Sequence, residues 1–82
     1  MGKSVYSTRY KRFLALLKQA KLDAGLTQME VAKYLNQPQS YVSKCESGER
    51  RVDIVELLNF AEVYQRQIQD FVQMANEAEN VE

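Results

Sequence analysis

The sequence predicts an all-α fold, a compact bundle of five helices. Apolar residues recur at three- and four-residue steps along most of the chain, two segments carry paired capping signals, and no segment has the strict alternation of a half-buried strand. The 82 residues, 45% of them apolar and 27% charged, suit one globular domain. We expect this domain over residues 7–72, with a disordered N-terminus at 1–6 and an acidic tail at 73–82.

The first helix is predicted from Ser7 to Ala24. Gly25 follows its last apolar residue, and a glycine there adopts the left-handed backbone that ends a helix at little cost. The stripe expected to face the core is made up of Tyr10, Phe13, Leu14, Leu17, Ala20 and Ala24.

Capping boxes predict where two further helices begin. In the first, Thr27 caps the helix and Glu30 returns a bond to the Thr27 amide; in the second, Asp53 and Glu56 do the same. The apolar residues expected to face inward after these starts are Val31, Ala32 and Leu35 in the one helix and Ile54, Leu57, Leu58, Phe60, Ala61 and Tyr64 in the other.

A tight turn and a short helix are predicted between these two elements. Asn36 tolerates a left-handed backbone and Pro38 disfavours helix at Gln37, so the chain should turn there. A helix then runs from about Gln39 to Ser47 and is closed by Gly48. The last helix is expected to begin near Gln67, with Ile68, Phe71 and Val72 facing inward.

Charge is distributed unevenly along a chain whose net charge is zero. Residues 1–52 hold ten basic and four acidic side chains, a net charge of +6, and residues 53–82 hold one basic and seven acidic side chains, a net charge of −6. A basic front half of this kind can face a polyanion.

Composition also disfavours several function classes. With one cysteine and no histidine, the chain has no internal disulfide and no imidazole to bind a metal or to transfer a proton near neutral pH, and we expect no metal or other cofactor. No apolar run reaches the roughly 18 residues that a membrane span needs, and no secretory signal is evident, so we expect a cytosolic protein. An enzyme ranks last because no catalytic constellation is evident.

The helix from Gln39 to Ser47 has two unlike faces. Val42 and Cys45 fall on one side. The other side collects Ser40, Ser43, Lys44 and Ser47, with Gln39 at its edge. Hydroxyls, an amide and one cation suit a nucleic-acid groove, although a solvated surface would explain the same pattern. A short helix, a tight turn and a second short helix together predict a helix-turn-helix.

The stretch LTQMEVAKYLNQPQSYVSKCESGERRVDIVELLNFAEVY resembles the Cro and phage-repressor class of helix-turn-helix domains, the xenobiotic-response-element (XRE) family of bacterial regulators. The resemblance covers about Phe13 to Val72 and rests on GLTQ, on the pattern S-Y-V-S-K-x-E-x-G and on L-L-x-F-A. It implies a lambda-repressor-like domain and a sequence-specific DNA-binding regulator, foremost a repressor, encoded by a bacterium or a phage.

The resemblance also implies which residues contact double-stranded DNA. The base-reading residues would be Gln39, Ser40, Ser43 and Lys44, with Gln39 suited to adenine and Lys44 to guanine. The phosphate-binding residues would be Gln28, Tyr41, Ser47, Arg50 and Arg51. Simpler roles stay open: Gln28 as an ordinary helix-start residue, Tyr41 packed against the preceding helix, and the arginines as solubilising charges.

Two further residues of the helix from Gln39 to Ser47, which would be the recognition helix, have structural interpretations. Glu46 matches an acid that the family pairs with a basic residue of the first helix, here Lys21, so it should lock the recognition helix to the scaffold. Lysine lacks the bidentate geometry of arginine, which would loosen this lock. Cys45 stands where the family places a buried aliphatic residue and is expected in the core rather than in redox or metal chemistry.

Operator recognition by so small a module calls for two copies on a pseudo-palindromic site. We therefore expect a homodimer held by the back half of the chain, with Phe71, Val72 and Met74, taken as exposed, as the candidate contacts. No small-molecule ligand is evident. The alternative function is a protein-interaction module, such as an antitoxin-like partner built on the same scaffold.

Overall fold

The structure, a computed structural model, describes residues 7–72. Its helices are α1 (Thr8–Asp23), α2 (Gln28–Leu35), α3 (Gln39–Ser47) and α4 (Ile54–Tyr64), followed by a fifth helix that occupies 68–72 at the end of the described residues. No strand occurs within this range. The predicted all-α fold of five helices is confirmed, whereas the predictions for 1–6 and 73–82 fall outside the described residues.

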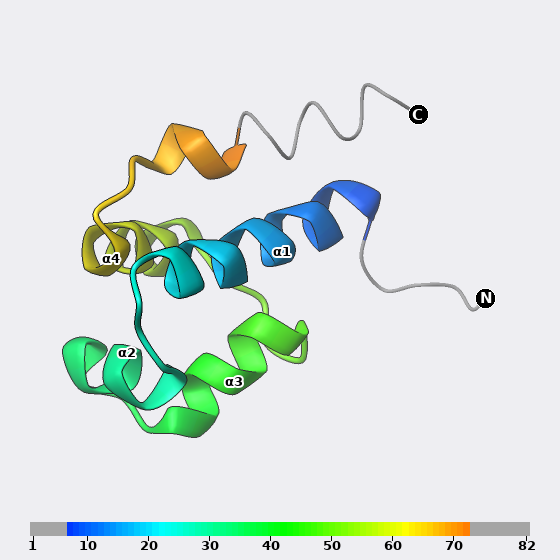
Figure 1. The fold of residues 1–82 in the computed structure, drawn as a ribbon. Helices are drawn as coiled ribbons and strands as arrows, with labels where there is room; N and C mark the ends of the chain where they lie inside the picture. The colour runs from blue at the N-terminus through cyan, green and yellow to red at the C-terminus, as the bar shows by residue number, and fades with distance from the viewer. Residues whose placement is uncertain (1–6, 73–82) are drawn as a thin grey trace.

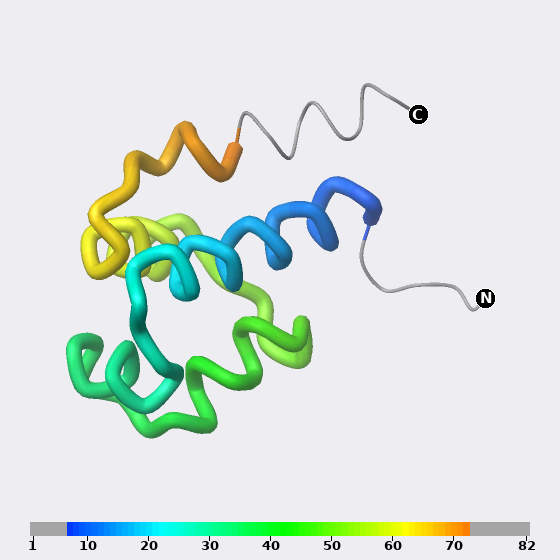
Figure 2. The backbone as a smooth tube through the Cα atoms, viewed as in Figure 1, coloured from blue at the N-terminus to red at the C-terminus, as the bar shows by residue number. Residues whose placement is uncertain are grey.

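The helices form a compact globule in which α1 and α4 lie between the fifth helix and the pair formed by α2 and α3 (Figure 1). Both α3 and α4 pack against α1 and α2. The backbone trace in Figure 2 shows the tight turn that joins α2 to α3. Between residues 7 and 72, no helix is both long and apolar enough to cross a bilayer.

Local signals determine where the helices begin. In the first capping box the Thr27 amide donates to Glu30 Oε1 at 2.9 Å and the Glu30 amide donates to Thr27 Oγ1 at 3.1 Å. In the second, the Asp53 amide donates to Glu56 Oε1 at 3.0 Å and the Glu56 amide to Asp53 Oδ1 at 2.8 Å. Both predicted boxes are confirmed, and each satisfies amides that the first turn of a helix leaves unpaired.

Left-handed residues end three of these helices, and a fourth lies just past α1. Gly25 and Asn36 have φ of +74° and +58°, as predicted, and Gly48 has φ of +89°. Gln65 caps α4 with φ of +57°, a conformation that costs a side-chain-bearing residue roughly 1–2 kcal/mol. Pro38 precedes α3 without a side-chain capping bond, so α3 has the weakest local start signal of the four.

The core draws residues from every helix. Its buried members are Leu17, Ala20, Val31, Ala32, Val42, Cys45, Leu57, Phe60, Ala61, Tyr64 and Phe71. Val42 and Cys45 are both 0% exposed, so the inner face of α3 is held against the rest of the domain as predicted. Filled core positions of this kind fix the orientation of a short helix that local signals alone specify weakly.

Four residues predicted to face inward are exposed. Ala24 follows the last residue of α1 and lies beyond the buried stripe. Ile54 and Leu58 are 62% and 50% exposed. Both lie at or beyond the edge of the buried stripe that runs along one side of α4. Val72 is 55% exposed.

A dimer contact would require an exposed side chain, but Phe71 is buried. It is 2% exposed, and its ring meets the Phe13 ring edge-on with centroids 6.4 Å apart. The assignment of Phe71 to an exposed contact is therefore wrong, since this ring closes the core of its own subunit. Of the two other candidates, Val72 is exposed and Met74 lies outside the described residues.

Candidate nucleic-acid interface

The outer face of α3 is open. Gln39, Ser40, Ser43 and Lys44 are all exposed, on the side opposite the fully buried Val42 and Cys45. Within residues 7–72 the Lys44 ammonium has no ion pair or hydrogen bond. Four short or flexible polar side chains therefore project from a helix whose other face is fixed.

A buried ion pair joins α3 to α1. Lys21 Nζ lies 3.0 Å from Glu46 Oε1, and the two side chains are only 7% and 5% exposed. The predicted lock is confirmed. Removing either partner would leave a buried charge uncompensated, so this pair holds α3 in one orientation against α1.

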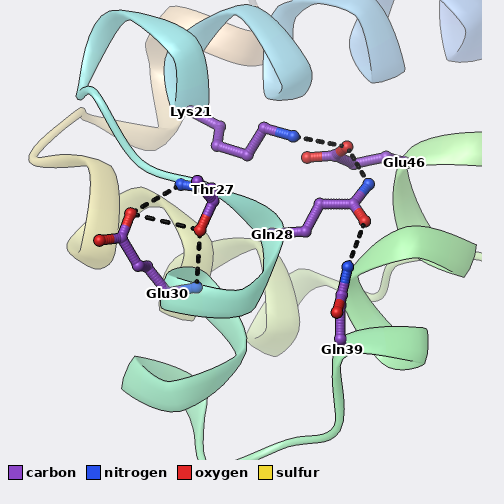
Figure 3. Close-up of polar contacts among 6 residues, drawn as sticks. All are labelled: Lys21, Thr27, Gln28, Glu30, Gln39 and Glu46. Carbon is purple, nitrogen blue, oxygen red and sulfur yellow. Dashed lines mark hydrogen bonds and ion pairs between the residues drawn. The ribbon is translucent and has the colours of Figure 1, made fainter.

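The same carboxylate also binds α2. Gln28 Nε2 donates to Glu46 Oε1 at 2.9 Å, and Gln39 Nε2 donates to Gln28 Oε1 at 3.4 Å (Figure 3). Gln28 is half-buried and Gln39 is exposed, so the chain of contacts runs from the interior to the surface. Gln28 is thus more than an ordinary helix-start residue, and the sequence patterns gave no sign of its bond to Glu46.

Tyr41 packs against α4. The Tyr41 ring stacks on the Phe60 ring, with centroids 6.1 Å apart and planes 6° from parallel. The Arg50 guanidinium lies over the Tyr41 ring, 4.8 Å from the ring centroid. Burial raises the pKa of Tyr41 to about 12, with Cys45 and Glu56 acting in the same direction. The hydroxyl therefore stays protonated and can donate a hydrogen bond.

Arg50 is already paired within the domain. Its Nη2 lies 2.7 Å from Glu56 Oε2, and Nη1 donates to the Arg51 carbonyl at 3.3 Å. The hydrogen bond from Arg50 lowers the pKa of Glu56, and the same bond raises the pKa of Arg50. Glu56, at the start of α4, thus offsets part of the positive charge that was predicted to attract DNA phosphates.

The remaining predicted phosphate ligands lie around the end of α3. Ser47 Oγ donates to the Lys44 carbonyl at 3.2 Å. The Arg51 guanidinium lies 4.4 Å from the centroid of the Tyr10 ring, and the Tyr10 hydroxyl accepts from the Val52 amide at 3.0 Å. Tyr10 therefore attaches the loop after α3 to α1, a role that its place in an apolar stripe did not indicate.

Comparison with known proteins assigns the family. A family model described as a helix-turn-helix domain matches residues 12–71. A solved structure, an XRE-family like protein from Pseudomonas syringae pv. tomato str. DC3000, is 38% identical, covers 84% of each chain and superposes with a TM-score of 0.79. The chain belongs to the XRE family of helix-turn-helix domains. No curated protein matches the sequence.

Members of the XRE family are typically DNA-binding regulators without enzymatic activity. In this chain the helix-turn-helix corresponds to α2 and α3, whose outer residues are described above. In the part of the chain that the structure describes, no group of three or more histidine, cysteine, aspartate or glutamate side chains is arranged to hold a metal ion.

Cys45 lies in the core of the domain. It is 0% exposed, and burial raises the pKa of its thiol. A buried, protonated thiol is a poor nucleophile and packs as a small apolar residue, in agreement with the core role predicted for it.

Proposed function

We propose that this XRE-family domain is a sequence-specific transcriptional regulator that reads the DNA major groove with α3, acts as a homodimer, and represses by occupying a promoter. The observation that supports the proposal most is the exposed face formed by Gln39, Ser40, Ser43 and Lys44 on a helix whose rear is buried. Such a helix can enter the groove as a rigid element.

Each base-reading residue has a suitable partner. Lys44, whose ammonium is unpaired within the described residues, can donate to the guanine acceptors O6 and N7. Gln39 can pair with the N6 donor and the N7 acceptor of adenine. Ser40 and Ser43 are short enough to let the helix approach the base edges and can bond to a base or to the backbone.

Phosphates on either side of the groove would be bound by the flanking residues. The amides at the start of α2, with Gln28, face one strand, and Ser47, Arg50 and Arg51 follow α3 toward the other. The Tyr41 hydroxyl is a further donor. Because Glu56 pairs with Arg50, the share of the phosphate attraction that Arg50 can supply is reduced.

The homodimer would bring two copies of α3 into successive major grooves, roughly one helical turn apart. With Phe71 buried, exposed apolar residues on α4 are better contacts: Ile54, Val55 and Leu58 are 62%, 60% and 50% exposed. All three belong to α4, the helix that follows the loop after α3.

Selection of bound sequences from a random double-stranded DNA pool tests the function. We expect enrichment of a pseudo-palindrome whose half-sites lie about one turn apart, bound with an affinity that falls steeply as salt rises. Enrichment of a single half-site would reject the homodimer but not sequence-specific recognition. A pool that stays random would reject sequence-specific recognition.

A further inference from the structure

The bonds that join Lys21, Glu46, Gln28 and Gln39 have a fixed direction. An ionised carboxylate only accepts hydrogen bonds, and Glu46 Oε1 forms an ion pair with Lys21 Nζ at 3.0 Å. Gln28 must therefore turn its amide nitrogen toward Glu46, which leaves its carbonyl oxygen facing Gln39 (Figure 3). Reversing Gln28 would set its oxygen against the carboxylate.

The same constraint passes to the exposed residue. Gln28 Oε1 only accepts, so Gln39 must present its amide nitrogen to it, as the 3.4 Å contact has it. One N–H of Gln39 is then engaged, and its carbonyl oxygen and second N–H remain for the DNA. Gln39 thus offers one acceptor and one donor.

One acceptor and one donor match adenine, which offers the N6 donor and the N7 acceptor in the major groove. Guanine offers two acceptors there, O6 and N7, and would need both N–H groups of Gln39. Gln39 could meet that need only by releasing Gln28.

We propose that Glu46, held by Lys21, is a specificity-determining positioning residue: acting through Gln28, it sets the direction of the Gln39 amide and so favours adenine over guanine at the base pair that Gln39 faces. This inference rests on the proposed function. It gives Glu46 a part in DNA readout although its side chain is only 5% exposed.

The test uses the full chain and the DNA sequence enriched from the random pool. The Gln39→Ala variant first identifies the base pair at which preference is lost. Binding of the unaltered protein to operators with adenine or guanine at this position then gives a preference ratio. Gln28→Met breaks the series of bonds but keeps the Lys21–Glu46 pair, and we expect the ratio to fall about tenfold.

A double variant tests Glu46 itself. Lys21→Met with Glu46→Leu removes both buried charges together, which proteins tolerate better than the loss of one partner. We expect the ratio to fall as it does for Gln28→Met, while the preference at the base pair read by Lys44 is unchanged. Gln19→Met is the matched control, since it alters an exposed glutamine whose bond to Asp23 lies outside this series, and it should leave both ratios unchanged.

The outcomes separate the two proposals. If Gln28→Met weakened binding to every operator equally, Gln28 would act only as a phosphate anchor and the inference would be overturned. This result would decide the question even if the double variant failed to fold. A folded double variant with an unchanged ratio would also overturn the inference. If Gln39→Ala relaxed no position, or if no sequence were enriched, the proposed function would fail first.

Discussion

Lys21 and Glu46 form a buried ion pair between α1 and α3, with Nζ and Oε1 3.0 Å apart. We expect Glu46→Ala to destabilise the fold by about 3–5 kcal/mol, because it leaves the Lys21 ammonium buried without its carboxylate. Urea unfolding at neutral pH measures this loss. The exposed Glu49→Ala is the control and should change stability little; an equal loss in the two variants would contradict a special role for the pair.

Arg50 and Glu56 predict a dependence of stability on pH. The pKa of Glu56 is lowered by its bond to Arg50, so this carboxylate contributes stability above its ordinary pKa of about 4.3, and the contribution is lost as pH falls through the lower folded pKa. We expect Glu56→Gln to reduce the difference in unfolding free energy between pH 7 and pH 3.

The matched control for this titration is Glu62→Gln, which alters an exposed acid on the same helix. Thermal or urea unfolding at several pH values should show the acid-induced loss unchanged in Glu62→Gln and smaller in Glu56→Gln. Identical pH profiles for the two variants would mean that the Arg50–Glu56 pair does not contribute to folding.

Gln65 is a site where stability can be gained. Its φ of +57° is unfavourable for a side-chain-bearing residue, whereas glycine adopts it freely. After the added unfolded-state entropy of glycine, we expect Gln65→Gly to stabilise the domain by about 0.5–1 kcal/mol in urea unfolding. Asn36→Gly should gain less, because asparagine tolerates the left-handed region. A loss of stability in Gln65→Gly would contradict this reading of the backbone.

Arg51 should act on DNA affinity without regard to sequence. We expect Arg51→Ala to weaken binding by a similar factor for every operator variant and to reduce the slope of log K against log salt by about one. Titrations at several salt concentrations measure this slope. A variant that kept the full slope, or that changed preference at one base pair only, would show that Arg51 does not act through phosphate.

Local signals explain why much of the fold could be predicted from the sequence. The boxes at Thr27 and Asp53 and the left-handed residues Gly25 and Asn36 act within a few residues of themselves. The Lys21–Glu46 pair could be expected only from the family resemblance, because its partners lie 25 residues apart.

The remaining features depend on how the helices pack. Periodicity placed Ile54 and Leu58 inside because both are apolar, but the stripe of α4 that meets its neighbours leaves them exposed. Phe71 is buried because it reaches Phe13, far away in the chain. The bond from Gln28 to Glu46 likewise requires the angle between α2 and α3, which no sequence pattern expresses.

Lys44→Ala tests the central claim, that the outer face of α3 reads bases, most directly. Its affinity should be measured on the enriched operator and on every single-base variant of it. We predict a loss of about 1–3 kcal/mol in discrimination, confined to one base pair of each half-site. The same loss at every base pair, or none at any, would contradict the claim.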